Sequence, residues 1–178
     1  MIEVIIDSIR VSLMSQHRIV ILKDTTTDRY LPIWIGPCEA DAITIELQEV
    51  PPQRPLTHDL LKAVIQEFGG RIVHILISDL RNDVYYARIV VEVNGRQIEI
   101  DSRPSDAIAL GVRAKAPIFV SDMVMERAAI RPDEDMQSES LPGDEPEEVD
   151  EGRLSAFKDF VNSLDLDDLD DEDDQSLR

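Results

Sequence analysis

The feature that most constrains this chain is an internal repeat. Residues 30–47 read YLPIWIGPCEADAITIEL, and residues 95–112 read GRQIEIDSRPSDAIALGV. With an offset of 65 positions, five residues of the first copy recur in the second, as Ile98, Ile100, Asp106, Ala107 and Ile108. Each copy combines a short strand of alternating apolar residues, a turn that contains proline, and a helix with acidic residues near its start. A repeated strand–turn–helix unit predicts one fold built from two similar halves.

The apolar patterns extend the repeat to three strands and one helix in each half. The first half is expected to contain strands at 2–14, 18–24 and 30–35 and a helix near 38–48. The second half is expected to contain strands at 71–79, 84–93 and 96–100 and a helix from about 102 to 114, before a last short strand at 117–121. This order predicts an α+β fold with mostly local strand pairing and packed mixed sheets.

One further helix is expected between the two halves. Thr57 has the character of an N-cap, and Gly69-Gly70 ends the segment. The helical spacing of five apolar residues predicts a buried stripe formed by Leu60, Leu61, Val64, Ile65 and Phe68.

The charge divides the chain into a body and a tail. Residues 1–131 carry 15 Lys and Arg against 18 Asp and Glu, whereas residues 132–178 carry 3 against 19. We therefore expect one domain at 1–131 and an acidic, largely disordered tail at 132–178. Within the tail, residues 153–166 have the spacing of a short amphipathic helix that a protein partner would bind. The alternatives are a solubilising extension and a nucleic-acid mimic that inhibits the body.

Other compositional features narrow the class of protein. The single cysteine, Cys38, excludes an intrachain disulfide. The sequence starts with a strand-like segment rather than a secretory signal, and no apolar run is long enough to span a bilayer. We therefore expect a cytoplasmic protein without a membrane segment. Neither part has the large basic excess of a constitutive nucleic-acid binder, although an enzyme that holds its substrate weakly remains compatible with this charge.

Three segments resemble the bifunctional nuclease family. They are LPIWIG at 31–36 followed by Glu39-Ala40, PLTHDLL at 55–61, and DSRPSDAIAL at 101–110. The resemblance covers roughly residues 1–130 in order. It implies a duplicated α+β fold and an ability to cut both DNA and RNA.

The segment from Asp101 to Asp106 is the strongest candidate for chemistry. Carboxylates that hold a divalent ion activate water and neutralise phosphate charge, and Mg²⁺ or Mn²⁺ prefers such ligands. Asp101 and Asp106 are predicted as metal ligands and catalytic residues, with Arg103 and Ser105 binding the substrate phosphate. The alternative is structural: Ser102 would cap the helix, Asp106 would suit the helix dipole, and Arg103 would pair with Asp101.

Three residues outside that segment complete the predicted site. Glu39 occupies the matching turn of the first half and is predicted as a third metal ligand, although an acid at a helix start is common. His58 is predicted as a general acid or phosphate contact, against the alternative of an exposed first-turn residue. Arg54 is predicted to reach a phosphate, against the alternative of a solvated surface arginine.

These observations predict a metal-assisted nuclease with little sequence specificity. The alternative function is a non-catalytic interaction or regulatory scaffold that uses its acidic tail. In both cases, exposed strand edges favour self-association, most simply as a dimer.

Overall fold

The computed structural model describes residues 1–11 and 18–131. In chain order, the described elements are β1 (Ile2–Val11), β2 (Arg18–Asp24), β3 (Tyr30–Ile35), α1 (Pro37–Leu47), α2 (Thr57–Glu67), β4 (Gly70–Arg81), β5 (Val84–Val93), β6 (Arg96–Ser102), α3 (Pro104–Ala114), β7 (Ile118–Val120) and α4 (Asp122–Ala128). The predictions for the acidic tail and its helix at 153–166 lie outside the described residues.

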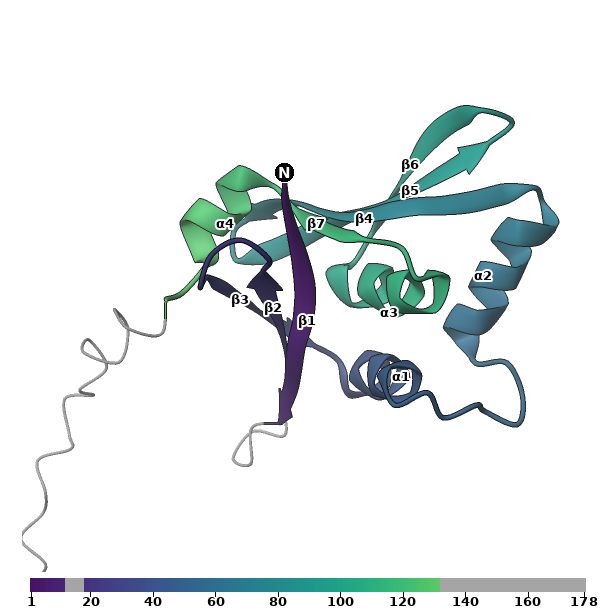
Figure 1. The fold of residues 1–178 in the computed structure, drawn as a ribbon, viewed down its shortest axis with the longest axis horizontal. Coiled ribbons are helices and arrows are strands. Elements are labelled where there is room, and N and C mark those ends of the chain that lie inside the picture. Colours follow the sequence, from purple (N-terminus) through teal and green to yellow (C-terminus); the bar gives the residue numbers. More distant parts are fainter. Residues whose placement is uncertain (12–17, 132–178) are drawn as a thin grey trace, which may run out of the picture. The chain divides into compact units, whose positions relative to one another are not determined.

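The described strands form one sheet with the order β3-β2-β1-β7-β4-β5-β6. The β1-β2-β3 and β4-β5-β6 groups are antiparallel meanders, as their short connections predict. β7 lies between the groups, antiparallel to β1 and parallel to β4. The α+β prediction is confirmed, and the expected packed sheets are instead joined through β7 into a single mixed sheet (Figure 1).

The duplication is confirmed by the order of elements in each half. β1, β2, β3 and α1 correspond to β4, β5, β6 and α3. Each repeated helix starts with a proline, Pro37 or Pro104, directly after an extended N-cap residue. Proline suits this position because its missing N–H would have no partner in the helix.

This match corrects the offset inferred from sequence. The two prolines are 67 positions apart, not 65, so Glu39 rather than Asp41 is the counterpart of Asp106. Gly36 is likewise the counterpart of Arg103. The correction matters for the site, because the two equivalent acids occupy the same turn of their helices.

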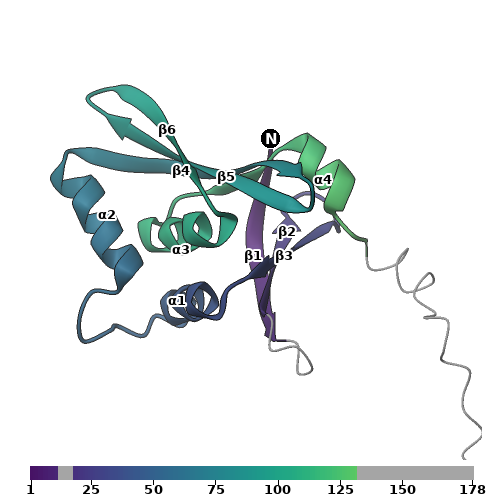
Figure 2. The same cartoon turned by 180° about the vertical axis from the view of Figure 1, so that it is seen from behind.

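The core lies between the sheet and the repeated helices. α1, α2 and α3 lie on the same side of the β4 and β5 strands (Figures 1 and 2). α3 is buried along most of its length, and Ile108 and Leu110 are fully inaccessible. A Cβ atom on Gly111 would meet Ile75 Cγ1 at 2.7 Å, so glycine permits this close approach of α3 to β4.

The prediction of which side of α2 is buried is wrong. Leu60, Val64 and Phe68 were expected to be buried, but their exposed fractions are 60%, 43% and 80%. Leu61 is also exposed, and only Ile65 of the predicted stripe is partly buried. α2 instead directs His58 inward, where it is 8% exposed. The apolar spacing identified the helix but not the face that packs on the domain.

Two local details also differ from expectation. The N-cap of α2 is Leu56, and Thr57 is already helical; the backbone N–H of Leu56 donates to Asp59 at 2.7 Å. α4 was not predicted from the sequence, although Ser121 and Asp122 form a recognisable helix start. The Ser121 hydroxyl accepts a hydrogen bond from the backbone N–H of Val124, which caps that helix.

Candidate functional site

A pocket forms where three helices begin. Its volume is about 640 Å³, and it is lined by the starts of α1, α2 and α3. The lining includes Cys38, Glu39 and Asp41 from α1, Pro55 to His58 at the start of α2, and Arg103 and Asp106 from α3. Free N–H groups and the aligned peptide dipoles of a helix start favour an anion. The convergence of three such starts therefore favours a negatively charged ligand.

Arg103 joins the two halves of the domain across this pocket. Its Nε donates to Asp106 Oδ2 at 2.6 Å, and its Nη2 donates to Glu39 Oε1 at 2.7 Å. The two equivalent acids of the duplication thus bind one guanidinium. The side chain of Arg103 is still 67% exposed, so the N–H groups of Nη1 remain available to a bound phosphate.

The counterpart of Arg103 in the first half is Gly36, which has no side chain for a structural reason. A Cβ atom on Gly36 would overlap the carboxylate of Glu39. Glycine therefore lets Glu39 fold back over the start of α1 and reach Arg103.

His58 completes the cluster from the first turn of α2. Its Nε2 lies 3.3 Å from Asp106 Oδ1. A hydrogen-bonded carboxylate that remains ionised only accepts, so Nε2 carries the proton and donates it to Asp106. In the neutral imidazole, Nδ1 then holds the lone pair. Asp106 thus orients His58 as a base in the way that a carboxylate orients the histidine of a catalytic triad.

The electrostatic balance keeps Asp106 charged. Burial raises the pKa of Asp106, but hydrogen bonds from Arg103 and His58 outweigh it, and the pKa lies below its ordinary value. The hydrogen bonds that Arg103 donates to Asp106 and Glu39 raise the pKa of Arg103. At neutral pH Asp106 is therefore an ionised carboxylate beside the permanent cation of Arg103.

Arg113 supports the pocket from beneath. It is 3% exposed, and its Nε donates to Asp59 Oδ1 at 2.7 Å. Its two terminal nitrogens donate to the carbonyl oxygens of Ala109 and Ala42, so one side chain links all three helices. Arg113 was not predicted from the sequence. The signal was a lone arginine after the apolar stretch AIALGV, since a buried arginine needs partners.

The structure brings together four of the predicted site residues and separates three. Glu39, His58, Arg103 and Asp106 share the pocket. Asp101 is exposed on β6, Ser105 is buried and lines a neighbouring pocket with Arg103, and Arg54 is exposed in the connector before α2. The alternative pairing of Arg103 with Asp101 is wrong, because Arg103 bonds Asp106 and Glu39 instead.

The arrangement does not fit a bound divalent ion without rearrangement. Mg²⁺ and Mn²⁺ need free carboxylate oxygens, whereas Glu39 and Asp106 both bind the guanidinium of Arg103. Among residues 1–11 and 18–131, no group of three or more His, Cys, Asp or Glu is placed to hold a metal ion. A divalent metal ion held by Asp101, Asp106 and Glu39 stays a prediction.

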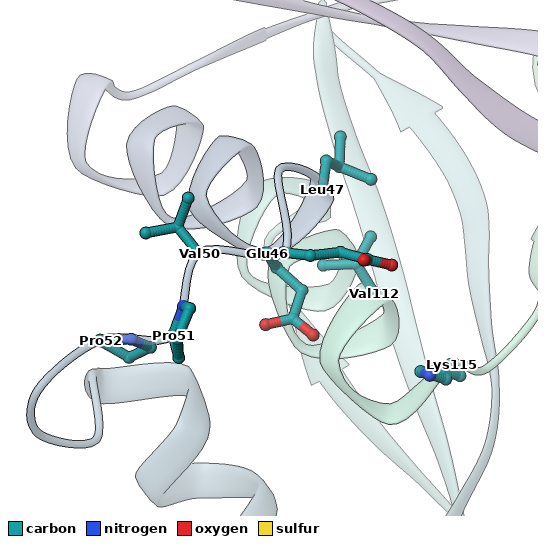
Figure 3. A pocket seen from close by; sticks show the side chains of 8 residues that line it. Glu46, Leu47, Val50, Pro51, Pro52, Val112 and Lys115 are labelled. Carbon is teal, nitrogen blue, oxygen red and sulfur yellow. The ribbon is translucent and has the colours of Figure 1, made fainter.

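A second pocket lies at the opposite ends of α1 and α3 (Figure 3). Its lining combines Leu47, Val50 and Val112 with Glu46, Glu49 and Lys115. Helix C-termini carry negative partial charge, and the two glutamates add to it. The helix dipoles therefore disfavour a phosphate in this pocket, whereas the dipoles at the helix starts favour one.

The sequence is similar to a family model and to known proteins over most of the described domain. Residues 20–133 match the family described as the bifunctional nuclease domain. A Mycobacterium tuberculosis protein named "Uncharacterized protein MT1877" is 36% identical over 166 residues, which cover 93% of this chain and 96% of that protein. "Bifunctional nuclease 1" of Oryza sativa subsp. indica is 26% identical over 70% of this chain and 38% of its own length. "Bifunctional nuclease 1" of Arabidopsis thaliana is 27% identical over 59% of this chain and 34% of its own length.

Proposed function

Because the chain belongs to the bifunctional nuclease domain family, we propose that it hydrolyses phosphodiester bonds of DNA and RNA at the pocket where α1, α2 and α3 begin. The observation that carries the proposal is the cluster of Arg103, Asp106 and His58 at those helix starts. The cluster combines an anion contact with an oriented base. The plant relatives that are named as nucleases are matched over only about a third of their length, so the proposal rests on this geometry as well.

Arg103 and the helix starts bind the substrate in this proposal. The exposed Nη1 group of Arg103 contacts a phosphate oxygen, and Glu39 and Asp106 hold the guanidinium in place. Such contacts read the sugar–phosphate backbone rather than the bases. They support cleavage with little sequence specificity and without discrimination between DNA and RNA.

His58 moves the proton in the hydrolysis step. Nδ1 accepts a proton from water as the water oxygen forms a new bond to phosphorus. The ester P–O bond then breaks, and the imidazolium returns the proton to the leaving oxygen. Asp106 keeps Nε2 protonated throughout. Its Oδ1, 3.3 Å from Nε2, also stabilises the transient imidazolium.

The proposal is tested by cleavage of labelled single- and double-stranded DNA and RNA by the purified full-length chain. His58→Ala should slow cleavage by about 100-fold or more, the usual contribution of a general base. His74→Ala is the matched control, because His74 lies on β4 in edge contact with Phe119 and does not line the pocket. His74→Ala should leave the rate within about threefold of the parent, within the normal effect of a remote substitution.

Parallel reactions with Mg²⁺, Mn²⁺ or EDTA test the predicted metal dependence separately. Equal rates for the parent chain and His58→Ala would contradict the proposed role of His58. Failure of the folded parent chain to cut any of the four substrates under any metal condition would contradict the nuclease proposal, and would favour a non-catalytic scaffold.

A cytoplasmic location and a partner bound by the acidic tail stay predictions. The described helices include none that is long and apolar enough to cross a membrane.

A further inference from the structure

α2 is inverted relative to an ordinary surface helix. Its outward side carries Leu60, Leu61 and Val64, and Phe68 follows as its C-cap residue; we call these four residues the α2 outer face. Phe68 alone is 80% exposed. Single exposed apolar residues are common, but a continuous apolar stripe at helical spacing indicates a surface that contacts another molecule.

The inward side of α2 is held mainly by polar contacts. His58 bonds Asp106, Asp59 bonds Arg113, and Lys62 Nζ donates to the carbonyl oxygen of Arg113 at 2.6 Å. Ile65 is the apolar residue of α2 that packs partly against the core. Few apolar side chains of α2 therefore pack on its own domain. Covering the exposed apolar side chains of α2 with another surface would be favourable in free energy.

Further exposed apolar residues lie on the edge strand β6. At Gly70, a Cβ atom would meet both Ile65 of α2 and Val91 of β5, so these side chains are neighbours. Ile98 pairs with Val91 and Ile100 with Ile89, yet Ile98 and Ile100 are 50% and 43% exposed. α2 and the β5–β6 hairpin lie at the same end of the described domain, away from α4 (Figures 1 and 2).

We propose that the α2 outer face is the contact surface between two copies of this chain, which pack their α2 helices antiparallel about a two-fold axis. The crossing lies near the middle of the stripe, between Leu60 and Val64. Two apolar helix faces with residues three and four positions apart interdigitate in this way. The partner that fits the α2 outer face is therefore an identical face.

Charge complementarity favours a second copy in this orientation. The start of α2 has positive partial charge and follows Arg54, whereas its last residue, Glu67, is negative and exposed. Antiparallel packing places Glu67 of one copy near the first turn of α2 in the other, where free N–H groups favour a carboxylate. A parallel arrangement would place like ends together.

The exposed apolar residues supply part of the area that a dimer requires. An aromatic side chain buries about 150–250 Å², so the two copies of Phe68, at 80% exposure, would together remove about 300 Å² from water. A stable interface buries about 1,600 Å² in total. The other residues of the α2 outer face, with Ile98 and Ile100, supply the rest of an apolar interface centre.

The arrangement also connects assembly to the pocket. His58 lies in the first turn of the same helix, two residues before Leu60. Covering the outer face would hold α2 against the domain and keep His58 beside Asp106. This consequence for cleavage rests on the proposed function, whereas the dimer itself does not.

Sedimentation velocity of the full-length chain over a range of concentrations tests the proposal. The parent chain should sediment as a dimer of two 20.1 kDa copies. Leu60→Glu should raise the dissociation constant of the dimer by at least about 10-fold, because it buries a charge in the interface. Met123→Glu is the matched control: it also changes an apolar helix residue, 53% exposed on α4, and should leave the dimer intact.

A cross-linking measurement checks the contact surface independently of stability. In a Cys38→Ser background, Leu60→Cys should give a covalent dimer with a short bis-maleimide, and Met123→Cys should give none. Far-ultraviolet circular dichroism shows whether each variant is folded. A monomeric parent chain at all concentrations, or folded Leu60→Glu that dimerises as tightly as Met123→Glu, would overturn the proposal. Both results are independent of nuclease activity, so they are distinguishable from failure of the proposed function.

Discussion

Arg113→Met provides the strictest test of how the pocket is held together. Methionine fills much of the space of the arginine stem but donates no hydrogen bonds. The change removes the ion pair to Asp59 and the bonds to the carbonyl oxygens of Ala42 and Ala109. The links from α3 to α1 and α2 beneath the pocket are lost together.

The expected destabilisation follows from these contacts. A hydrogen bond to a charged group contributes about 1.5–3 kcal/mol. Removing one partner of a fully buried ion pair costs about 3–5 kcal/mol. The Asp59 side chain is 26% exposed and keeps its bond from the Leu56 N–H, so water and that bond relieve part of the cost. The two carbonyl groups lie within helices and keep helical partners. We therefore expect the free energy of unfolding to fall by about 3 kcal/mol.

Urea unfolding at neutral pH measures this change for Arg113→Met, Asp59→Asn and the double variant. The double variant should lose less than the sum of the single losses, because the two residues interact directly. Arg96→Met, at an exposed position on β6, is the matched control and should change stability by less than about 0.5 kcal/mol. A loss below about 1 kcal/mol in Arg113→Met, or additive single losses, would refute the argument that this ion pair links the helices.

Three further predictions follow from local contacts. Gly36→Ala should displace the Glu39 carboxylate from Arg103 and slow cleavage by about 10-fold with little loss of stability, measured by cleavage rate beside thermal melting; a normal rate would contradict the role of the glycine. Arg103→Lys should slow cleavage by about 100-fold, because an ammonium group cannot form the two parallel hydrogen bonds of a guanidinium. Arg54→Lys should leave the cleavage rate unchanged, and equal rates for the two variants would contradict the role of Arg103. Asp24 is 1% exposed, and hydrogen bonds from its own loop outweigh burial and hold its pKa well below the ordinary value, so its contribution to stability is complete above about pH 4 and is lost as the pH falls through the folded pKa. Acid titration of the unfolding free energy should therefore show a shallower decline in Asp24→Asn than in the parent, and identical slopes would contradict this.

The sequence was sufficient to predict the duplicated framework. Alternating apolar residues and paired prolines mark the strands and the starts of α1 and α3 because these signals are local. The offset of 65 positions between the two copies was wrong by two residues. It aligned identical residues, such as Asp41 and Asp106, rather than the first residues of the two helices. The prolines, which have a backbone reason for their position, gave the better alignment.

The candidate site was predicted only in part, because some of its signals are local in the sequence and others depend on the tertiary structure. Acids and an arginine near helix starts were recognisable, but nothing local shows that Glu39 crosses from the other half to bind Arg103. Asp101 was chosen because it is five residues from Asp106 in the sequence, whereas the strand leaves it exposed on β6. The burial of His58 was also beyond local reasoning. The apolar stripe of α2 predicts the opposite orientation, and only the contacts with Asp106 and Arg113 show which side faces inward.

The most direct measurement compares cleavage of labelled RNA and DNA by Asp106→Asn and Asp101→Asn in the full-length chain. Both substitutions neutralise one aspartate of the same motif, but only Asp106 orients His58 and binds Arg103. We predict a loss of about 100-fold or more for Asp106→Asn and a rate within about threefold of the parent for Asp101→Asn. A folded Asp106→Asn variant that cuts at the parent rate, or an equal loss in Asp101→Asn, would contradict the assignment of the site.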